Sequence, residues 1–148
     1  MDKTRCDYSI LADPQIFAVN KMEPVSAHKY EYGSDTDEKL RIDLNGSWKF
    51  QFAMNYDSCE KDFWKNGTDV STWDDIEVPG HVELQGYDVP RYVNIMYPWD
   101  GYEDLKPGEI PTEYNPVYNY VLYTDVPENY VGRAYISFQG VESALHCG

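Results

Sequence analysis

Large apolar side chains alternate with polar ones from Trp48 to Phe52, directly after an Asn-Gly pair at residues 45 and 46. A period of two is typical of a half-buried β-strand. The pattern predicts a strand over residues 44–52 with Trp48, Phe50 and Phe52 on one face. That apolar face needs a partner, as the inner face of a β-sandwich does.

Other segments rich in β-branched and aromatic residues predict further strands at residues 76–78, 118–126 and 133–138. A Pro-Gly turn at residues 79 and 80 follows the first of these. A short helix is expected only near residues 57–64. We therefore predict an all-β fold with antiparallel strands and long loops.

A long aromatic loop is predicted from Gly86 to Pro116. Proline fixes φ and removes a backbone donor, so regular structure is disfavoured where prolines recur. The aromatic residues of this loop indicate that it is ordered, and long ordered loops are usually functional. The prolines are residues 90, 98, 107, 111 and 116, and the aromatic residues include Tyr87, Tyr92, Tyr97, Trp99 and Tyr102.

The chain divides into an arm and a domain. Residues 1–39 show little periodicity and predict an extended N-terminal arm with a linker, whereas residues 40–148 carry the strand patterns. We count about four or five strands where a jelly roll uses about eight. The expectation is a truncated jelly roll with unpaired strand edges, which is marginally stable and prone to aggregate.

Charge excludes two classes of partner. The 148 residues have 26 acidic and 12 basic side chains and a formal net charge of -14. This field repels nucleic acid and anionic membranes. The 3 cysteines form no metal or disulfide pattern, and no signal peptide or membrane span is visible. A cytoplasmic location with reduced thiols is expected.

Catalytic motifs are missing from this sequence. The three histidines, His28, His81 and His146, lie far apart and are expected to be packing or surface residues. The acidic runs at residues 35–38 and 74–75 are expected to be solvated loops. The aromatic, amide-containing stretch from Gly86 to Trp99 suits a carbohydrate, because sugars offer C–H faces to rings and hydroxyls to amides. The alternative is that these rings only pack the loop onto the sandwich.

The segment VPGHVELQGYDVPRYVNIMYP at residues 78–98 resembles the signature of the sugar-binding domain of family 2 β-galactosidases. Other motifs similar to that family occur around it in the family's order. They are DPQIFAVNK at residues 13–21, LNGSWKF at 44–50, PTEYNPV at 111–117 and FQGVESA at 138–144.

The resemblance implies a jelly-roll domain within a retaining β-galactosidase, an enzyme that hydrolyses terminal β-D-galactose from substrates such as lactose. Both catalytic Glu residues would lie in a later barrel, so no catalytic residue is expected in this chain and it should be inactive alone. The resemblance also assigns Asn94 a contact with galactose and Ile95 a place on the aglycone side. The alternative for Asn94 is a loop residue that caps its own backbone.

Magnesium and sodium are implied for the full-length parent, together with a homo-oligomeric assembly. In some members of the family, the magnesium site of the arm uses an acidic residue three positions before that of Asp13, but Ile10 stands there in this sequence. Asp13 is thus the one candidate ligand, and no metal site or cofactor is predicted in the fragment. Two further departures are Val82 in place of tryptophan and Tyr118 in place of a glycine.

Two other functions remain open. The chain could be a non-catalytic carbohydrate-binding module that uses its Tyr and Trp loop. It could also be a complementing piece of a split enzyme, which assembles with a separately encoded remainder.

Overall fold

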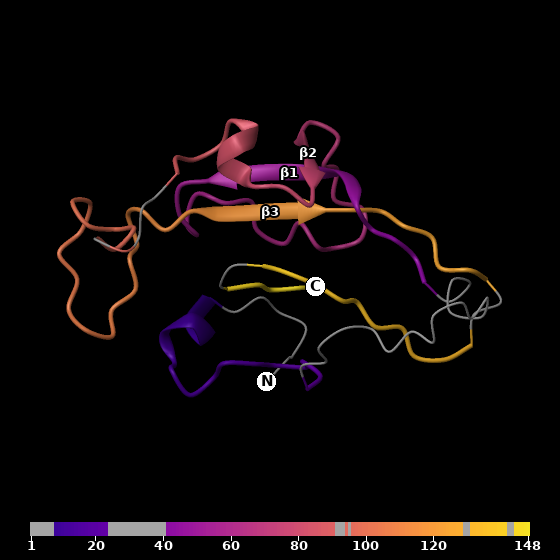
Figure 1. The fold of residues 1–148 in the computed structure, drawn as a ribbon, viewed down its shortest axis with the longest axis horizontal. Coiled ribbons are helices and arrows are strands. Elements are labelled where there is room, and N and C mark those ends of the chain that lie inside the picture. The colour runs from indigo at the N-terminus through magenta and orange to yellow at the C-terminus, as the bar shows by residue number, and fades with distance from the viewer. Residues whose placement is uncertain (1–7, 24–40, 91–93, 95, 129–130, 142–143) are drawn as a thin grey trace.

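The computed structural model describes residues 8–23, 41–90, 94, 96–128, 131–141 and 144–148. Its centre is a three-stranded antiparallel sheet of order β2-β1-β3, formed by β1 (Gly46–Ala53), β2 (Asp74–Val78) and β3 (Val117–Val121). The described helices are two short 3-10 turns, η1 (Tyr8–Ala12) and η2 (Val82–Gln85). The all-β prediction is confirmed, and Figure 1 shows the sheet with β1 between its two partners.

The predicted apolar face of β1 forms the core. Phe50 is 1% exposed and lies with Ile76 and Val82 at the centre of the buried cluster. The register places Trp48 opposite Ile76 and Phe50 opposite Tyr120, and residues opposite each other in an antiparallel pair share a face. The partly buried residues around this centre are Trp48, Phe52, Val78, Tyr87, Tyr118 and Tyr120.

Aromatic rings surround Phe50 and attach the long loop to the sheet. The Phe50 ring meets Tyr87 edge-on at a centroid distance of 4.6 Å and meets Tyr120 at 5.0 Å. Phe52 stacks on Tyr118 at 5.9 Å. Such pairs add to the free energy gained from area burial. Val82, which replaces the tryptophan expected from the resemblance, is buried in the same cluster.

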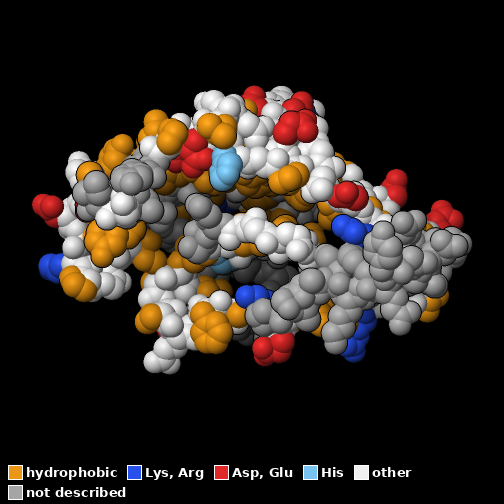
Figure 2. Space-filling view, viewed as in Figure 1, with side chains coloured by type: hydrophobic (Ala, Val, Ile, Leu, Met, Phe, Trp, Pro, Cys, Tyr) orange, Lys and Arg blue, Asp and Glu red, His pale blue; other side chains and the backbone are white. Residues whose placement is uncertain are grey.

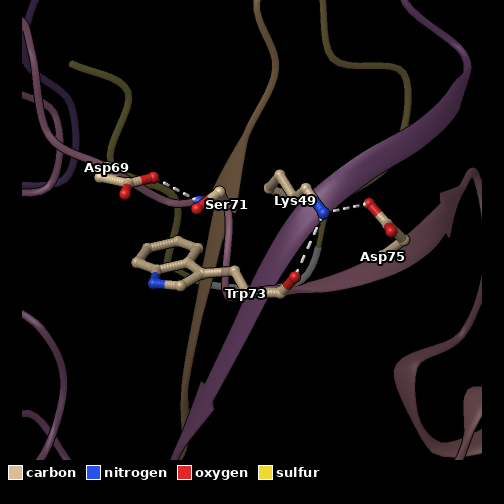
Figure 3. Close-up of polar contacts among 5 residues, drawn as sticks. All are labelled: Lys49, Asp69, Ser71, Trp73 and Asp75. Atoms are coloured by element: carbon tan, nitrogen blue, oxygen red, sulfur yellow. Dashed lines mark hydrogen bonds and ion pairs between the residues drawn. The ribbon is translucent and has the colours of Figure 1, made fainter.

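The acidic pair at residues 74 and 75 was expected in a loop, and this expectation is wrong. Asp74 and Asp75 begin β2, where the backbone of Asp75 lies opposite Lys49. Lys49 Nζ forms an ion pair with Asp75 Oδ1 at 2.9 Å and donates to the carbonyl oxygen of Trp73 at 3.2 Å (Figure 3). Both carboxylates stay exposed, so these residues join the strand through backbone pairing while their charges remain solvated.

The turn that leads into β2 is also shown in Figure 3. The Asp69 carboxylate accepts the backbone N–H of Ser71 at 2.9 Å. Hydrogen bonds from the side chain and backbone of Ser71 lower the pKa of Asp69. The turn closes with Trp73 N–H donating to the carbonyl of Val70, and both of those side chains are buried.

Two other local predictions are wrong. Residues 133–138 form no strand, and this segment is exposed. A strand requires a partner, and the described β3 pairs only with β1, so β propensity alone does not order the segment. Residues 57–64 form turns and bends rather than the expected helix, and Asp62 within them has a φ of 61°, which an α-helix does not allow. The predicted strand at 118–126 ends at Val121.

The boundary predicted between residues 39 and 40 lies at residues outside the described part of the chain. Residues 8–23 of the predicted arm are described and contain η1. Among the described residues, no helix has the length and apolar character needed to cross a membrane.

Candidate functional site

The loop that contains Asn94 starts from a fixed point on the sheet. The Gln85 side chain accepts from the backbone N–H of Glu77 at 2.9 Å and donates to its carbonyl oxygen at 3.0 Å, which docks η2 against β2. Gly86 then ends η2 with a φ of 96°, a conformation that favours glycine. Asp88 also has a positive φ, of 48°.

The Asp88 carboxylate connects the start of the loop to the segment that leads into β3. It accepts hydrogen bonds from the hydroxyls of Tyr114 and Tyr118, and the second of these measures 2.7 Å. Tyr114 is 4% exposed. Burial raises the pKa of Tyr118 far above its usual value, and the hydrogen bond to Asp88 raises it further. The Tyr118 hydroxyl therefore keeps its proton and acts as the donor.

The C-terminal end of the loop is also attached to the segment that leads into β3. The Tyr102 ring stacks on Tyr114 at a centroid distance of 4.3 Å with an interplanar angle of 15°. Glu103 Oε1 accepts from the backbone N–H groups of Thr112 at 2.7 Å, Glu113 at 2.6 Å and Tyr114 at 3.3 Å. Burial opposes ionisation of Glu103, but these hydrogen bonds outweigh it and lower the pKa of its carboxyl.

Among the described residues in the middle of the loop, several are open to solvent. Asn94 is exposed, and Tyr97 is 67% exposed. The Tyr97 ring lies flat on Trp99, with centroids 4.9 Å apart and an interplanar angle of 4°. The Asp100 carboxylate accepts from the backbone N–H of Tyr97 at 2.8 Å and holds this turn. Ile95, the other predicted substrate contact, lies outside the described residues.

Figure 2 shows hydrophobic side chains gathered at the end of the molecule where Figure 1 places the stretch around residues 96–110. The exposed apolar residues of that stretch include Met96, Tyr97 and Tyr102. An exposed amide and exposed rings are suited to binding a polyhydroxylated ring. The described loop offers both, in Asn94 and in Tyr97 three residues later.

Metal ligands are not assembled in the described part of the chain, which contains no group of three or more His, Cys, Asp or Glu side chains able to hold an ion. Asp13 Oδ1 accepts the backbone N–H of Gln15 at 2.9 Å, so this carboxylate stabilises a local turn. Mg²⁺ requires several oxygen ligands in octahedral geometry. The surroundings of Asp13 do not fit such a site by themselves. His81 and His146 are both exposed.

Comparison with known families identifies the domain. The model of the sugar-binding domain of glycosyl hydrolases family 2 matches residues 41–147, which include the sheet and the whole loop. This chain belongs to glycosyl hydrolase family 2. The predicted resemblance is therefore confirmed for the part of the sequence that contains Asn94.

Individual members of family 2 match over nearly the whole chain. The chain is similar to the β-galactosidase of Halalkalibacterium halodurans, with 47% identity over 97% of this chain and 15% of that protein. It is also similar to the β-galactosidases of Clostridium acetobutylicum, with 42% identity over 92% of this chain and 16% of that protein, and of Streptococcus thermophilus, with 41% identity over 98% and 15%. The chain thus spans only 15–16% of the length of these three relatives.

The sequence singled out Asn94 but missed the residues that attach its loop. Asp88 and Tyr114 are 26 positions apart, and Asp88 and Tyr118 are 30 apart. Nothing in either local pattern indicates a contact. Tyr118 was predicted to begin a strand and to replace a glycine, but its contact with the loop was missed. It lies within β3 without a positive φ, and its hydroxyl donates to Asp88.

Proposed function

We propose that this chain supplies the sugar-binding domain of a β-galactosidase that hydrolyses terminal, non-reducing β-D-galactose residues in substrates such as lactose. The observation that carries the proposal is the match of 97% of the chain to a protein named β-galactosidase at 47% identity. The exposed amide and rings of the loop support the same ligand class.

The proposed role of Asn94 is to orient galactose. Its amide can donate to one hydroxyl and accept from another, and orientation of a substrate contributes to rate by holding it near its reactive geometry. Ile95 is proposed to line the aglycone side. The exposure of Asn94 on an attached loop supports this role.

The catalytic carboxyls are proposed to lie in the remainder of the enzyme. Glycoside hydrolysis needs two carboxyl groups held about 5–10 Å apart across the sugar. The chain accounts for only 15% of the matched relative, which supports the proposal that this domain binds sugar and that the rest of the enzyme supplies the catalytic carboxyls. Magnesium, sodium and a homo-oligomeric parent are proposals that rest on the resemblance alone. The proposed cytoplasmic location rests on the pattern of cysteines and on the opening sequence.

The proposal is tested with a hybrid enzyme in which this chain replaces the matched segment of the Halalkalibacterium halodurans β-galactosidase. We expect the hybrid to hydrolyse a chromogenic β-galactoside, because the two segments belong to one family and are 47% identical over 97% of this chain. The relative with that segment deleted, and this chain alone, should show no turnover above buffer. Turnover by the purified chain alone, or a folded hybrid as inactive as the deletion, would contradict the proposal.

A second candidate is a carbohydrate-binding module that functions without a catalytic partner. The flat stack of Tyr97 on Trp99, with Tyr97 67% exposed, favours it because sugar C–H faces pack on such rings. Under this alternative the chain binds lactose in calorimetric titration and loses binding in Tyr97→Ala. Under the leading proposal the chain alone shows no heat of binding at millimolar lactose, since most of the site lies elsewhere.

A further inference from the structure

Both ends of the loop that contains Asn94 are attached to one buried tyrosine. The Tyr114 hydroxyl donates to Asp88 at the start of the loop, and the Tyr114 ring stacks on Tyr102 at the return. Glu103, next to Tyr102, accepts the backbone N–H of Tyr114. The Tyr118 hydroxyl also donates a hydrogen bond to Asp88. We call these five residues the Tyr114 clamp: Asp88, Tyr102, Glu103, Tyr114 and Tyr118.

We propose that the Tyr114 clamp is a positioning device that holds Asn94 in place for the sugar, an inference that rests on the proposed function of Asn94. Tyr114 contacts Asp88 before the loop and Tyr102 after it, so the clamp closes the base of the loop. Closing the base of a flexible loop restricts the positions that its middle can reach. A substrate contact displaced by about 1 Å can lose roughly 100-fold in rate.

The chemistry of the clamp favours a single geometry. Hydrogen bonds to a carboxylate are stronger than those between neutral groups, and Asp88 accepts one tyrosine hydroxyl on each oxygen and also the backbone N–H of Val89 on Oδ1. Tyr114 is buried, and Tyr118 lies in β3, where it packs against Phe50 and Phe52 of β1. The core of the sheet thus fixes the positions of the two tyrosine hydroxyls, and these hydroxyls in turn fix the position of Asp88 at the start of the loop.

Hydroxyl deletions in the hybrid enzyme separate positioning from packing. Tyr114→Phe and Tyr118→Phe each remove one hydrogen bond to Asp88 and keep the ring. We expect kcat/KM for a chromogenic β-galactoside to fall about 10-fold in Tyr114→Phe. The matched control is Tyr123→Phe, which removes a hydroxyl that donates to the carbonyl of Thr68 on another part of the surface and should leave kcat/KM unchanged.

The decisive measurement is a double-mutant cycle with Asn94→Ala. If the clamp acts through Asn94, Tyr114→Phe should cost less than about 2-fold in kcat/KM once Asn94 is alanine. A loss that is equal in both backgrounds overturns the inference, because the tyrosine would then act independently of Asn94.

Tryptic cleavage after Arg91 reports on the loop without any assay of activity. In the hybrid, cleavage at Arg91 should be roughly 5-fold faster in Asp88→Asn and Tyr114→Phe than in the unmodified hybrid, measured against cleavage at Lys65. Equal cleavage rates in the variants and the unmodified hybrid would overturn the inference that the clamp holds the loop. If cleavage accelerates but Asn94→Ala retains full activity, the clamp holds the loop but the proposed function of Asn94 is wrong, and the positioning inference fails with it.

Discussion

Replacing Phe50 with alanine should unfold the sheet. Phe50 is 1% exposed, lies at the centre of β1, and contacts rings from the long loop and from β3. Phe→Ala substitutions in cores cost about 3–5 kcal/mol, from lost burial and from the cavity that remains. Domains are stable by only about 5–15 kcal/mol, so this loss removes much or all of the free energy of unfolding.

The measurement is urea denaturation followed by circular dichroism and tryptophan fluorescence, in this chain and in the hybrid enzyme. Phe17→Ala is the matched control, because Phe17 is 93% exposed and its truncation should change the free energy of unfolding by less than about 0.5 kcal/mol. A change below about 1 kcal/mol in Phe50→Ala would show that the cluster around Phe50 is not the core.

Replacing Asn94 with alanine should impair the hybrid enzyme without destabilising it. Loss of two hydrogen bonds to galactose, each worth about 0.5–1.5 kcal/mol, predicts a fall in kcat/KM of roughly 10- to 100-fold. The stability should not change, because Asn94 is exposed. Steady-state kinetics with a chromogenic β-galactoside and a thermal melt of each variant measure the two effects.

Asn66→Ala is the control for Asn94→Ala, because Asn66 is also an exposed loop amide and lies between β1 and β2. It should leave both kcat/KM and the melting temperature unchanged. If Asn94→Ala keeps full kcat/KM, Asn94 does not contact the substrate, and its alternative role as a loop residue that caps the backbone is favoured.

Strand β1 could be predicted from the sequence because its information is local. The alternation of Trp48, Phe50 and Phe52 is complete within a few residues, and the structure buries this face as expected. The loop could be located for a similar reason, since prolines exclude regular structure wherever they recur. The family was also predicted correctly from the sequence, and its domain model matches residues 41–147.

Two of the wrong predictions concern segments whose structure depends on a partner strand. Asp74 and Asp75 are polar and were assigned to a loop, yet β1 supplies a paired edge and makes them part of β2. Residues 133–138 have strong β propensity, yet no described strand pairs with them, and Val131 nearby is 96% exposed. In both places propensity was overruled by the presence or absence of a neighbouring strand.

The sequence by itself determined the all-β class, the apolar face of β1, the place of the long loop and the family to which the domain belongs. Only the tertiary structure decided what attaches that loop, because Asp88 reaches Tyr114 and Tyr118 across 26 and 30 positions. The two tyrosines come into range when β3 pairs with β1 and places Tyr118 opposite Phe52. Side-chain hydrogen bonds at such separations depend on strand register and burial, which no local pattern contains.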